Sequence, residues 1–308
     1  MVAPPHTETD FIRPFRIEGQ NVNGRIVRLQ AVVTDILTRH NYPDVINHLL
    51  SEALVLAAML GSSLKFDGRF ILQLQGAGAI SMLMAEYKSA GEMRAYARFD
   101  AETLAAAQKS GVQGLALMQS DKQAAHMAFT IEQRTDGENY QGIVSLEGDN
   151  LAQAALGYFE RSEQISTRLK LASAPIILRA GKTKWCAGGI MLQQAPDIGG
   201  KMPSLRQDDD WHRLAILLDT TQDSELLDNT INVEKLLYRL FNEDDVRLFE
   251  PRVLRFLCSC SRLRVQNMLR ALPDTERTQM QVEDKIEVRC EFCAKLYQFS
   301  PQEAFTAD

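Results

Sequence analysis

Long apolar runs and excess positive charge are both missing from this sequence, and we expect no leader sequence. The longest uncharged apolar stretch, residues 53–64, is far shorter than the roughly 20 residues of a membrane-spanning helix. The first residues contain no apolar segment typical of a signal peptide, so we expect a cytoplasmic protein whose thiols are kept reduced. A net charge of −6 argues against a protein built mainly to neutralise nucleic-acid phosphates.

Two catalytic signatures are also absent. There is no glycine loop with the spacing that cradles nucleotide phosphates, and no Gly-x-Ser-x-Gly motif of a serine nucleophile. This absence fits a function that does not consume ATP. The chain is still 45% hydrophobic, which is enough for a core that folds without disulfide bonds.

Residues 1–200 are expected to form an α+β body. Apolar residues recur at helical spacing across residues 31–64 and again across residues 148–165. Between them the period changes to two, with glycines in the turns, which predicts mainly antiparallel strands. These strands are expected at residues 69–76, 79–87, 92–100, 125–133 and 140–148.

Residues 201–245 are expected to form a helical linker. A segment rich in proline, glycine and charge marks the end of the body. Each of two helices then carries an apolar stripe, with Trp211, Leu214 and Leu218 on the first and Leu236, Leu237, Leu240 and Phe241 on the second. Short helices are marginal in water, so they need an apolar surface to lie on. We therefore expect their docking to be conditional.

Four of the five cysteines lie in two close pairs near the end of the chain. Cys258 and Cys260 form a C-x-C pair, and after 29 intervening residues Cys290 and Cys293 form a C-x-x-C pair. Each pair can chelate one ion, and together they complete the tetrahedral thiolate set of structural zinc sites. Such soft ligands favour zinc or iron–sulfur over magnesium or calcium. A purely architectural zinc module would have the same ligands, and that alternative stays open.

Three features favour a reactive metal centre. A C-x-C pair is close enough to form a disulfide once the metal leaves, and C-x-x-C is an established redox spacing. Residues 246–270 carry six arginines against a single acid, Glu250. These arginines can activate thiolates, or they can simply offset the charge of the metal centre. The region is also small, and zinc contributes about 10–16 kcal/mol to the folding of such domains, so we expect metal loss to unfold it.

Five segments, in order, make nearly the whole chain resemble the heat-shock protein 33 family of redox-regulated holdase chaperones. They are "GSSLKFDGRFILQLQG", "YFERSEQIST", "AGGIMLQQAP", "CSCSRLR" and "EVRCEFCAKLYQF". Two positions depart from the family pattern, because Leu263 replaces an acidic residue and Ala294 replaces a frequent glycine. Neither position carries a ligand, so only local packing is in question.

The resemblance implies a substrate-handling body at residues 1–200, a metastable linker at 201–245 and a zinc-binding redox switch at 246–308. It implies that the four clustered cysteines hold one Zn²⁺ in an inactive, reduced form. Oxidation would pair Cys258 with Cys260 and Cys290 with Cys293, release the zinc and unfold the linker. The oxidised protein, often a homodimer, would then bind unfolded client proteins without ATP.

Client contacts are expected from the two linker stripes or from the body face that they cover, although ordinary core packing is the alternative. Cys186 has no cysteine near it in the sequence and is expected to be a small buried residue of the body.

Two other functions are weighed against the chaperone. A thiol–disulfide oxidoreductase could use Cys290 and Cys293, but such enzymes place the pair at a helix start in a βαβ unit, which the sequence here does not predict. A nucleic-acid-binding zinc module is suggested by the arginine run. Against it, residues 271–293 hold six acids and three bases, without the interleaved aromatics of a stacking platform. We expect a binding protein and not an enzyme.

Overall fold

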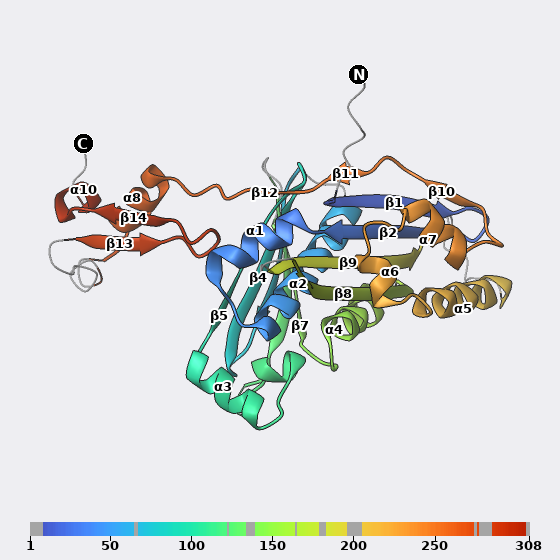
Figure 1. Ribbon diagram of the computed structural model, residues 1–308, viewed down its shortest axis with the longest axis horizontal. Coiled ribbons are helices and arrows are strands. Elements are labelled where there is room, and N and C mark those ends of the chain that lie inside the picture. The colour runs from blue at the N-terminus through green and yellow to red at the C-terminus, as the bar shows by residue number, and fades with distance from the viewer. Residues whose placement is uncertain are drawn as a thin grey trace, which may run out of the picture.

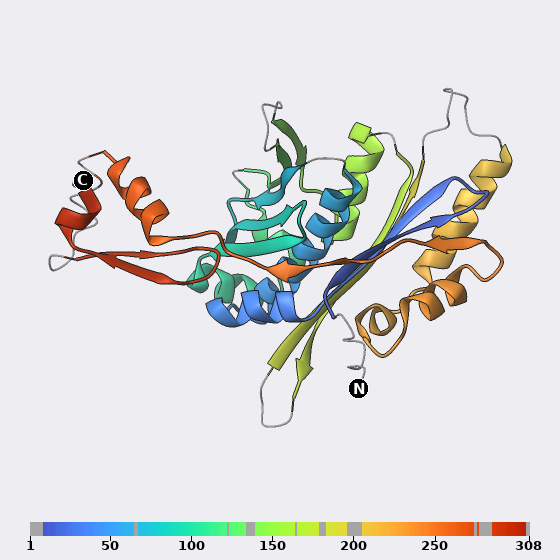
Figure 2. The same ribbon diagram turned by 90° about the horizontal axis from the view of Figure 1, so that it is seen from above.

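The computed structural model describes residues 9–64, 67–121, 123–133, 139–163, 165–178, 183–195, 205–273, 276 and 285–305. It is an α+β structure with mainly antiparallel strands, as the sequence predicts, and its two sheets enclose a long central helix (Figure 1). A smaller part with the four clustered cysteines extends from one end, and the linker helices lie at the other (Figure 2).

The first sheet has the strand order β10-β1-β2-β9-β8, and β11 also pairs with β1. All of its pairings among the described residues are antiparallel. The strands span β1 (Phe11–Ile17), β2 (Val22–Leu29), β8 (Thr167–Ile177), β9 (Thr183–Gln194), β10 (Val246–Leu248) and β11 (Arg252–Val253).

The second sheet has the order β12-β5-β4-β3-β6-β7. The pairing of β12 with β5 is parallel, whereas the other described pairings are antiparallel. The strands span β3 (Gly68–Gln75), β4 (Ile80–Lys88), β5 (Glu92–Phe99), β6 (His126–Gln133), β7 (Tyr140–Ser145) and β12 (Arg255–Phe256).

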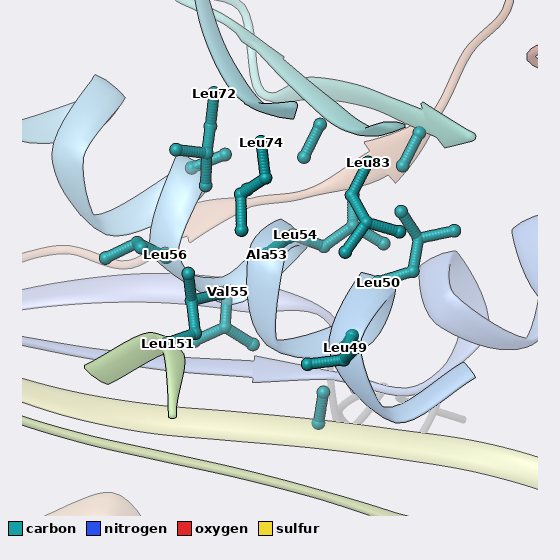
Figure 3. Packing of buried hydrophobic residues seen from close by; sticks show 14 of the residues in the cluster. Leu49, Leu50, Ala53, Leu54, Val55, Leu56, Leu72, Leu74, Leu83 and Leu151 are labelled. Carbon is teal, nitrogen blue, oxygen red and sulfur yellow. The ribbon is translucent and has the colours of Figure 1, made fainter. Parts of the chain in front are cut away.

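Helix α2 (Asp44–Ser63) is the core of the body, because it lies between the two sheets and is buried on nearly every side. Figure 3 shows its leucines beside Leu72 and Leu74 of β3 and Leu83 of β4. On the first sheet, a Cβ at Gly189 would lie only 2.8 Å from the Met59 side chain, so glycine allows the close approach. By length and composition α2 could cross a membrane, but 78% of its apolar window is buried inside the protein, as in a core helix.

Shorter helices complete the body. They are α1 (Ala31–His40), α3 (Ala101–Lys109) and α4 (Leu151–Tyr158), with a 3₁₀ turn (Gly114–Met118) and a π turn (Phe159–Glu163). The buried carboxylate of Asp10 accepts hydrogen bonds from the backbone N–H groups of Gln30, Ala31 and Val32 at 2.8–2.9 Å. It thereby satisfies N–H groups at the start of α1 that have no partner within the helix.

The linker helices are α5 (Leu205–Asp219), α6 (Asp223–Leu227) and α7 (Val233–Leu240). They lie on the face of the first sheet that points away from α2 (Figure 2). Their apolar side chains form a second core with Phe15, Ile26 and Ile190 of that sheet. The sequence predicts two helices here, and the short α6 is an addition to them.

Residues 246–257 form an extended strap that carries β10, β11 and β12 across the body. Beyond it lies the cysteine module, which we define as residues 258–273 and 285–305. The module contains α8 (Arg262–Arg270), β13 (Ile286–Arg289), β14 (Leu296–Phe299) and α10 (Pro301–Phe305). The strap therefore joins the module to both sheets, and the predicted division at residues 200 and 245 stays a prediction.

Candidate metal centre

The four clustered cysteines meet at one point. The sulfur atoms of Cys258, Cys260, Cys290 and Cys293 all lie within 4.8 Å of one another. The Cys258 and Cys290 sulfurs are 3.7 Å apart, and those of Cys260 and Cys293 are 3.4 Å apart. A tetrahedral zinc with sulfur ligands at about 2.3 Å places its sulfurs about 3.8 Å apart. The cluster therefore has the donors and the spacing to hold one metal ion.

The first pair lies between the strap and α8. Cys258 follows the strap directly, and Cys260 precedes Ser261, the N-cap residue of α8. The Ser261 hydroxyl accepts a hydrogen bond from the Arg264 N–H at 3.3 Å and caps α8. The Arg264 guanidinium in turn donates to the Ser259 carbonyl at 2.6 Å. We call residues 258–260 the first knuckle.

The second pair lies in the loop between β13 and β14, and we call residues 290–293 the second knuckle. The Cys290 N–H donates to the Lys295 carbonyl at 3.0 Å, and the Ala294 N–H donates to the Cys290 carbonyl at 2.8 Å. Ala294 has a φ of 56°, in the left-handed region that favours glycine. This conformation explains why a glycine is expected there, and it leaves a side chain in a strained position.

Hydrogen bonding prepares Cys260 to be a thiolate. Burial acts to raise the pKa of Cys260, but hydrogen bonds, led by one from the Tyr297 hydroxyl at 3.1 Å, lower that pKa to about 7. Burial raises the pKa of Cys258 and Cys293. Metal binding requires thiolates, so a metal entering this site displaces protons from the latter two thiols.

The module has a small core of its own. The buried apolar side chains in it are few, and Cys260 and Cys290 pack against them. These side chains are Val265, Leu269, Ile286, Tyr297, Phe299 and Ala304. A core of this size supplies little stability. Bonds from a metal to both knuckles would therefore contribute a major part of the stability of the module.

The cysteines are open to solvent on one side. A cleft of about 610 Å³ is lined by Cys258, Cys260 and Cys293 and by the cationic side chains of Arg39, Arg289 and Lys295. Small oxidants and chelators can therefore reach the sulfur atoms from this side. Cys186 lies apart from this cluster. It is buried in β9, and its thiol donates to the Ala174 carbonyl at 3.4 Å.

The apolar stripes of the linker helices are covered. Every predicted stripe residue except the half-buried Trp211 is at most 2% exposed, and all face the first sheet: Leu214, Leu218, Leu236, Leu237, Leu240 and Phe241. Polar contacts that the sequence analysis did not predict also hold the linker. Arg28 of β2 is 4% exposed and donates to the carbonyls of Glu225, Leu226 and Ile231 at 3.0, 3.1 and 2.5 Å.

Comparison with known proteins agrees over nearly the whole chain. The family model described as "Hsp33 protein" matches residues 10–300. A "33 kDa chaperonin" of Caulobacter vibrioides is 39% identical over 293 residues, which cover 95% of each chain. One from Pseudomonas aeruginosa is 37% identical over 295 residues, covering 95% of this chain and 92% of the relative. The crystal structure of the 33 kDa chaperonin (heat shock protein 33 homolog) from Thermotoga maritima superposes with a TM-score of 0.73. It is 21% identical over 96% of both chains, so it supports the fold.

Proposed function

This chain belongs to the Hsp33 protein family of chaperones, and from that premise we propose that it is a redox-regulated, ATP-independent holdase. In the reduced state its four clustered cysteines hold one Zn²⁺ and the protein is inactive. Oxidation of those cysteines releases the ion and exposes surfaces that bind unfolding proteins. The functional units are the body at residues 1–200, the linker at 201–245 and the redox switch at 246–308.

The convergence of four thiols from two distant segments carries this proposal. They lie within 4.8 Å of one another without a competing histidine or carboxylate in the group, as far as the described residues extend. A tetrahedral set of sulfur ligands suits zinc, which when bound would tie the two knuckles together. The apolar core of the module is small, so the same atoms would serve as metal ligands and as structural supports.

The switch chemistry needs an oxidant such as hydrogen peroxide. For each disulfide, one peroxide takes two electrons from two thiolate sulfurs and, with two protons from solvent, leaves as two waters. A sulfur–sulfur bond thus replaces two metal–sulfur bonds, and two such steps release the ion. We propose the pairs Cys258–Cys260 and Cys290–Cys293, although contacts across the knuckles are also short at 3.7 and 3.4 Å. Peptide mapping of the oxidised protein distinguishes these pairings.

Loss of the metal would then be transmitted through the strap. Cys258 follows the strap directly, and the strap N–H groups of Arg255 and Leu257 donate to the Gly91 and Met93 carbonyls of the body at 3.0 and 3.1 Å. If the module unfolds, the strap is no longer held at its carboxyl end, beyond Leu257. The linker helices depend on docking for their stability, so we expect them to leave the first sheet next.

Client binding would use the apolar surface that this opening uncovers. The linker contributes Trp211, Leu214, Leu218, Leu236, Leu237, Leu240 and Phe241, and the first sheet contributes the apolar face beneath them. Aggregation-prone chains expose comparable apolar surface, and burial of both is favourable. We further propose that the oxidised form is a homodimer, that the protein acts in the cytoplasm, and that it is not an enzyme.

One comparison of reduced protein with peroxide- and heat-treated protein tests the proposal. Before treatment we expect about one zinc per chain, as four thiolates imply, five titratable thiols and little suppression of a thermally aggregating client. After treatment the zinc should be free, one thiol should remain and suppression should be strong. The remaining thiol should be Cys186, and the matched variant Cys186→Ala should switch normally.

Three results would contradict this reading. Equal suppression by the reduced, metal-loaded protein would remove the switch, even if the zinc is real. Repeated turnover in an insulin-reduction assay would indicate a thiol–disulfide oxidoreductase instead. Binding to DNA or RNA with a steep salt dependence would favour the nucleic-acid-binding module.

A further inference from the structure

Arg94 of β5 joins the body to both knuckles of the metal centre. Its Nη1 atom donates to the Ser259 hydroxyl of the first knuckle at 3.3 Å. Its guanidinium also lies over the ring of Phe292 in the second knuckle, 3.9 Å from the ring centroid. A single side chain of the body therefore contacts the residues that stand between the cysteines of each pair.

The position of Arg94 is fixed from behind by a buried carboxylate. Glu86 of β4 is 2% exposed and accepts from Arg94 Nη2 at 2.6 Å. The Arg94 side chain is itself only 12% exposed, and its Nε atom is buried without a hydrogen-bond partner. A guanidinium that is held this firmly, with a donor left over, is prepared to face negative charge.

Arg98 and Tyr96 of β5 also contact the second knuckle. Arg98 pairs with Glu291 at 2.6 Å, but both side chains are about half exposed, and such pairs contribute about 0–1 kcal/mol. The ring of Tyr96 packs edge-on against Phe292, with the centroids 4.8 Å apart. These contacts contribute an exposed ion pair and aromatic packing to the interface, whereas Arg94 contributes a buried positive charge.

The charge of the centre changes with its redox state. Four thiolates around Zn²⁺ carry a formal charge of −2, whereas two disulfides carry none. Arg94 contacts the residue beside the cysteines in each knuckle, so its guanidinium lies close enough to the centre to interact with it electrostatically. The attraction between Arg94 and the centre is therefore present in the reduced, metal-bound state and absent in the oxidised one.

We propose that Arg94 is a positioning residue that couples the charge of the metal centre to the docking of the cysteine module on the body. While the centre is anionic, Arg94 holds both knuckles against β5. When oxidation neutralises the centre, that hold is lost together with the metal. This inference rests on the proposed function, because it takes the four cysteines to be metal-bound thiolates.

The test uses the full-length, reduced, zinc-loaded protein without client or oxidant. Hydrogen exchange is measured at the amides of Arg255 and Leu257, which donate to the carbonyls of Gly91 and of Met93 in β5. Their exchange therefore reports whether the strap and module are docked on the body. In Arg94→Gln we expect exchange about tenfold faster or more, since local opening controls these rates. Because docking and metal binding are linked, zinc affinity measured with a competing chelator should fall in the same variant.

Three further variants separate the causes. Arg69 is another cation near Glu86, with its Nη1 atom 3.7 Å from the carboxylate. Arg69→Gln removes that cation and leaves the contacts between Arg94 and the knuckles in place, so amide exchange in this variant should match the parent. The double variant Glu86→Gln/Arg94→Gln avoids an uncompensated buried carboxylate and should still show fast exchange. Arg94→Lys keeps the charge and should recover part of the protection lost in Arg94→Gln.

Each contrary outcome removes the inference. Parent-like exchange in Arg94→Gln and in the double variant would show that Arg94 does not hold the module. Equal loss in Arg69→Gln would assign the effect to the buried carboxylate, and no recovery in Arg94→Lys would exclude the charge. A parent protein that binds no zinc would instead refute the proposed metal site, independently of these variants.

Discussion

The Nε atom of Arg28, in the first sheet, donates a hydrogen bond to the main-chain carbonyl of Leu226, in the linker, at 3.1 Å. Two more bonds from the same guanidinium reach the carbonyls of Glu225 and Ile231. The body thus holds the linker backbone itself, at the end of α6, in addition to the apolar stripes. Since Arg28 is buried, these bonds are shielded from water and salt.

Arg28→Lys should loosen the reduced linker. Lysine cannot reach three carbonyls in this fork arrangement, and we expect a loss of about 2–3 kcal/mol in the free energy of unfolding. The measurement is limited proteolysis of residues 205–245 in the reduced protein, together with denaturant unfolding. Arg168→Gln is the control, because it breaks only an exposed pair with Asp219 and should cost under about 1 kcal/mol. Similar effects of the two variants would refute the importance of the buried bonds.

The linker stripes should behave as core in the reduced state. Leu240→Ala removes a side chain that is 2% exposed, which costs about 2–5 kcal/mol at such sites. Ile216→Ala, on the exposed side of α5, should change stability little. Thermal unfolding of the reduced protein measures the difference. If the stripe also contacts clients, oxidised Leu240→Ala should suppress aggregation less well, whereas unchanged suppression would restrict client contacts to other surfaces.

Ala294→Gly should strengthen the second knuckle. A non-glycine residue at φ 56° is disfavoured by about 1–2 kcal/mol, and glycine removes most of this cost. We expect zinc affinity to rise by about fivefold, which corresponds to about 1 kcal/mol. Ala271→Gly, at φ −82°, is the matched control and should bring no gain. Weaker zinc binding in Ala294→Gly would show that the alanine methyl group packs usefully.

Glu52 of α2 should make the reduced protein less stable at higher pH. Burial, and secondarily the charge of Asp223 in the linker, raise the pKa of Glu52 to about 7 from 4.5. Between these two values the folded state keeps a proton that the unfolded state loses, so stability falls as pH rises through this window and levels off above it. The loss is at most about 3 kcal/mol. Unfolding measured at pH 5 and pH 8 should show a smaller difference in Glu52→Gln, and an equal difference would assign the pH effect elsewhere.

The sequence predicts those parts of the fold whose partners are local. The alternating residues at 69–100 form β3, β4 and β5, and the helical spacing at 31–64 forms α1 and α2. The close spacing of the cysteines within each pair predicts that the two pairs converge in the fold, because a single metal ion would need ligands from both. The strap was not predicted, since strands of two or three residues are formed by the edges they pair with. Arg94 occupies an alternating polar position of β5 that looks solvent-facing, and Arg28, although it lies between Val27 and Leu29, is a residue type expected at the surface. Only the packed module and linker bury these two side chains.

The strap also has a consequence for the sheets themselves. It pairs with β1 at the edge of the first sheet and with β5 at the edge of the second. If it peels away, both edges present rows of unpaired main-chain N–H and C=O groups to water. Such edges add an extended chain of any sequence, because backbone hydrogen bonds do not read side chains. Detachment of the twelve-residue strap would thus open two sheet edges that bind extended chains without sequence preference. These edges would add to the apolar sheet face that the linker helices uncover.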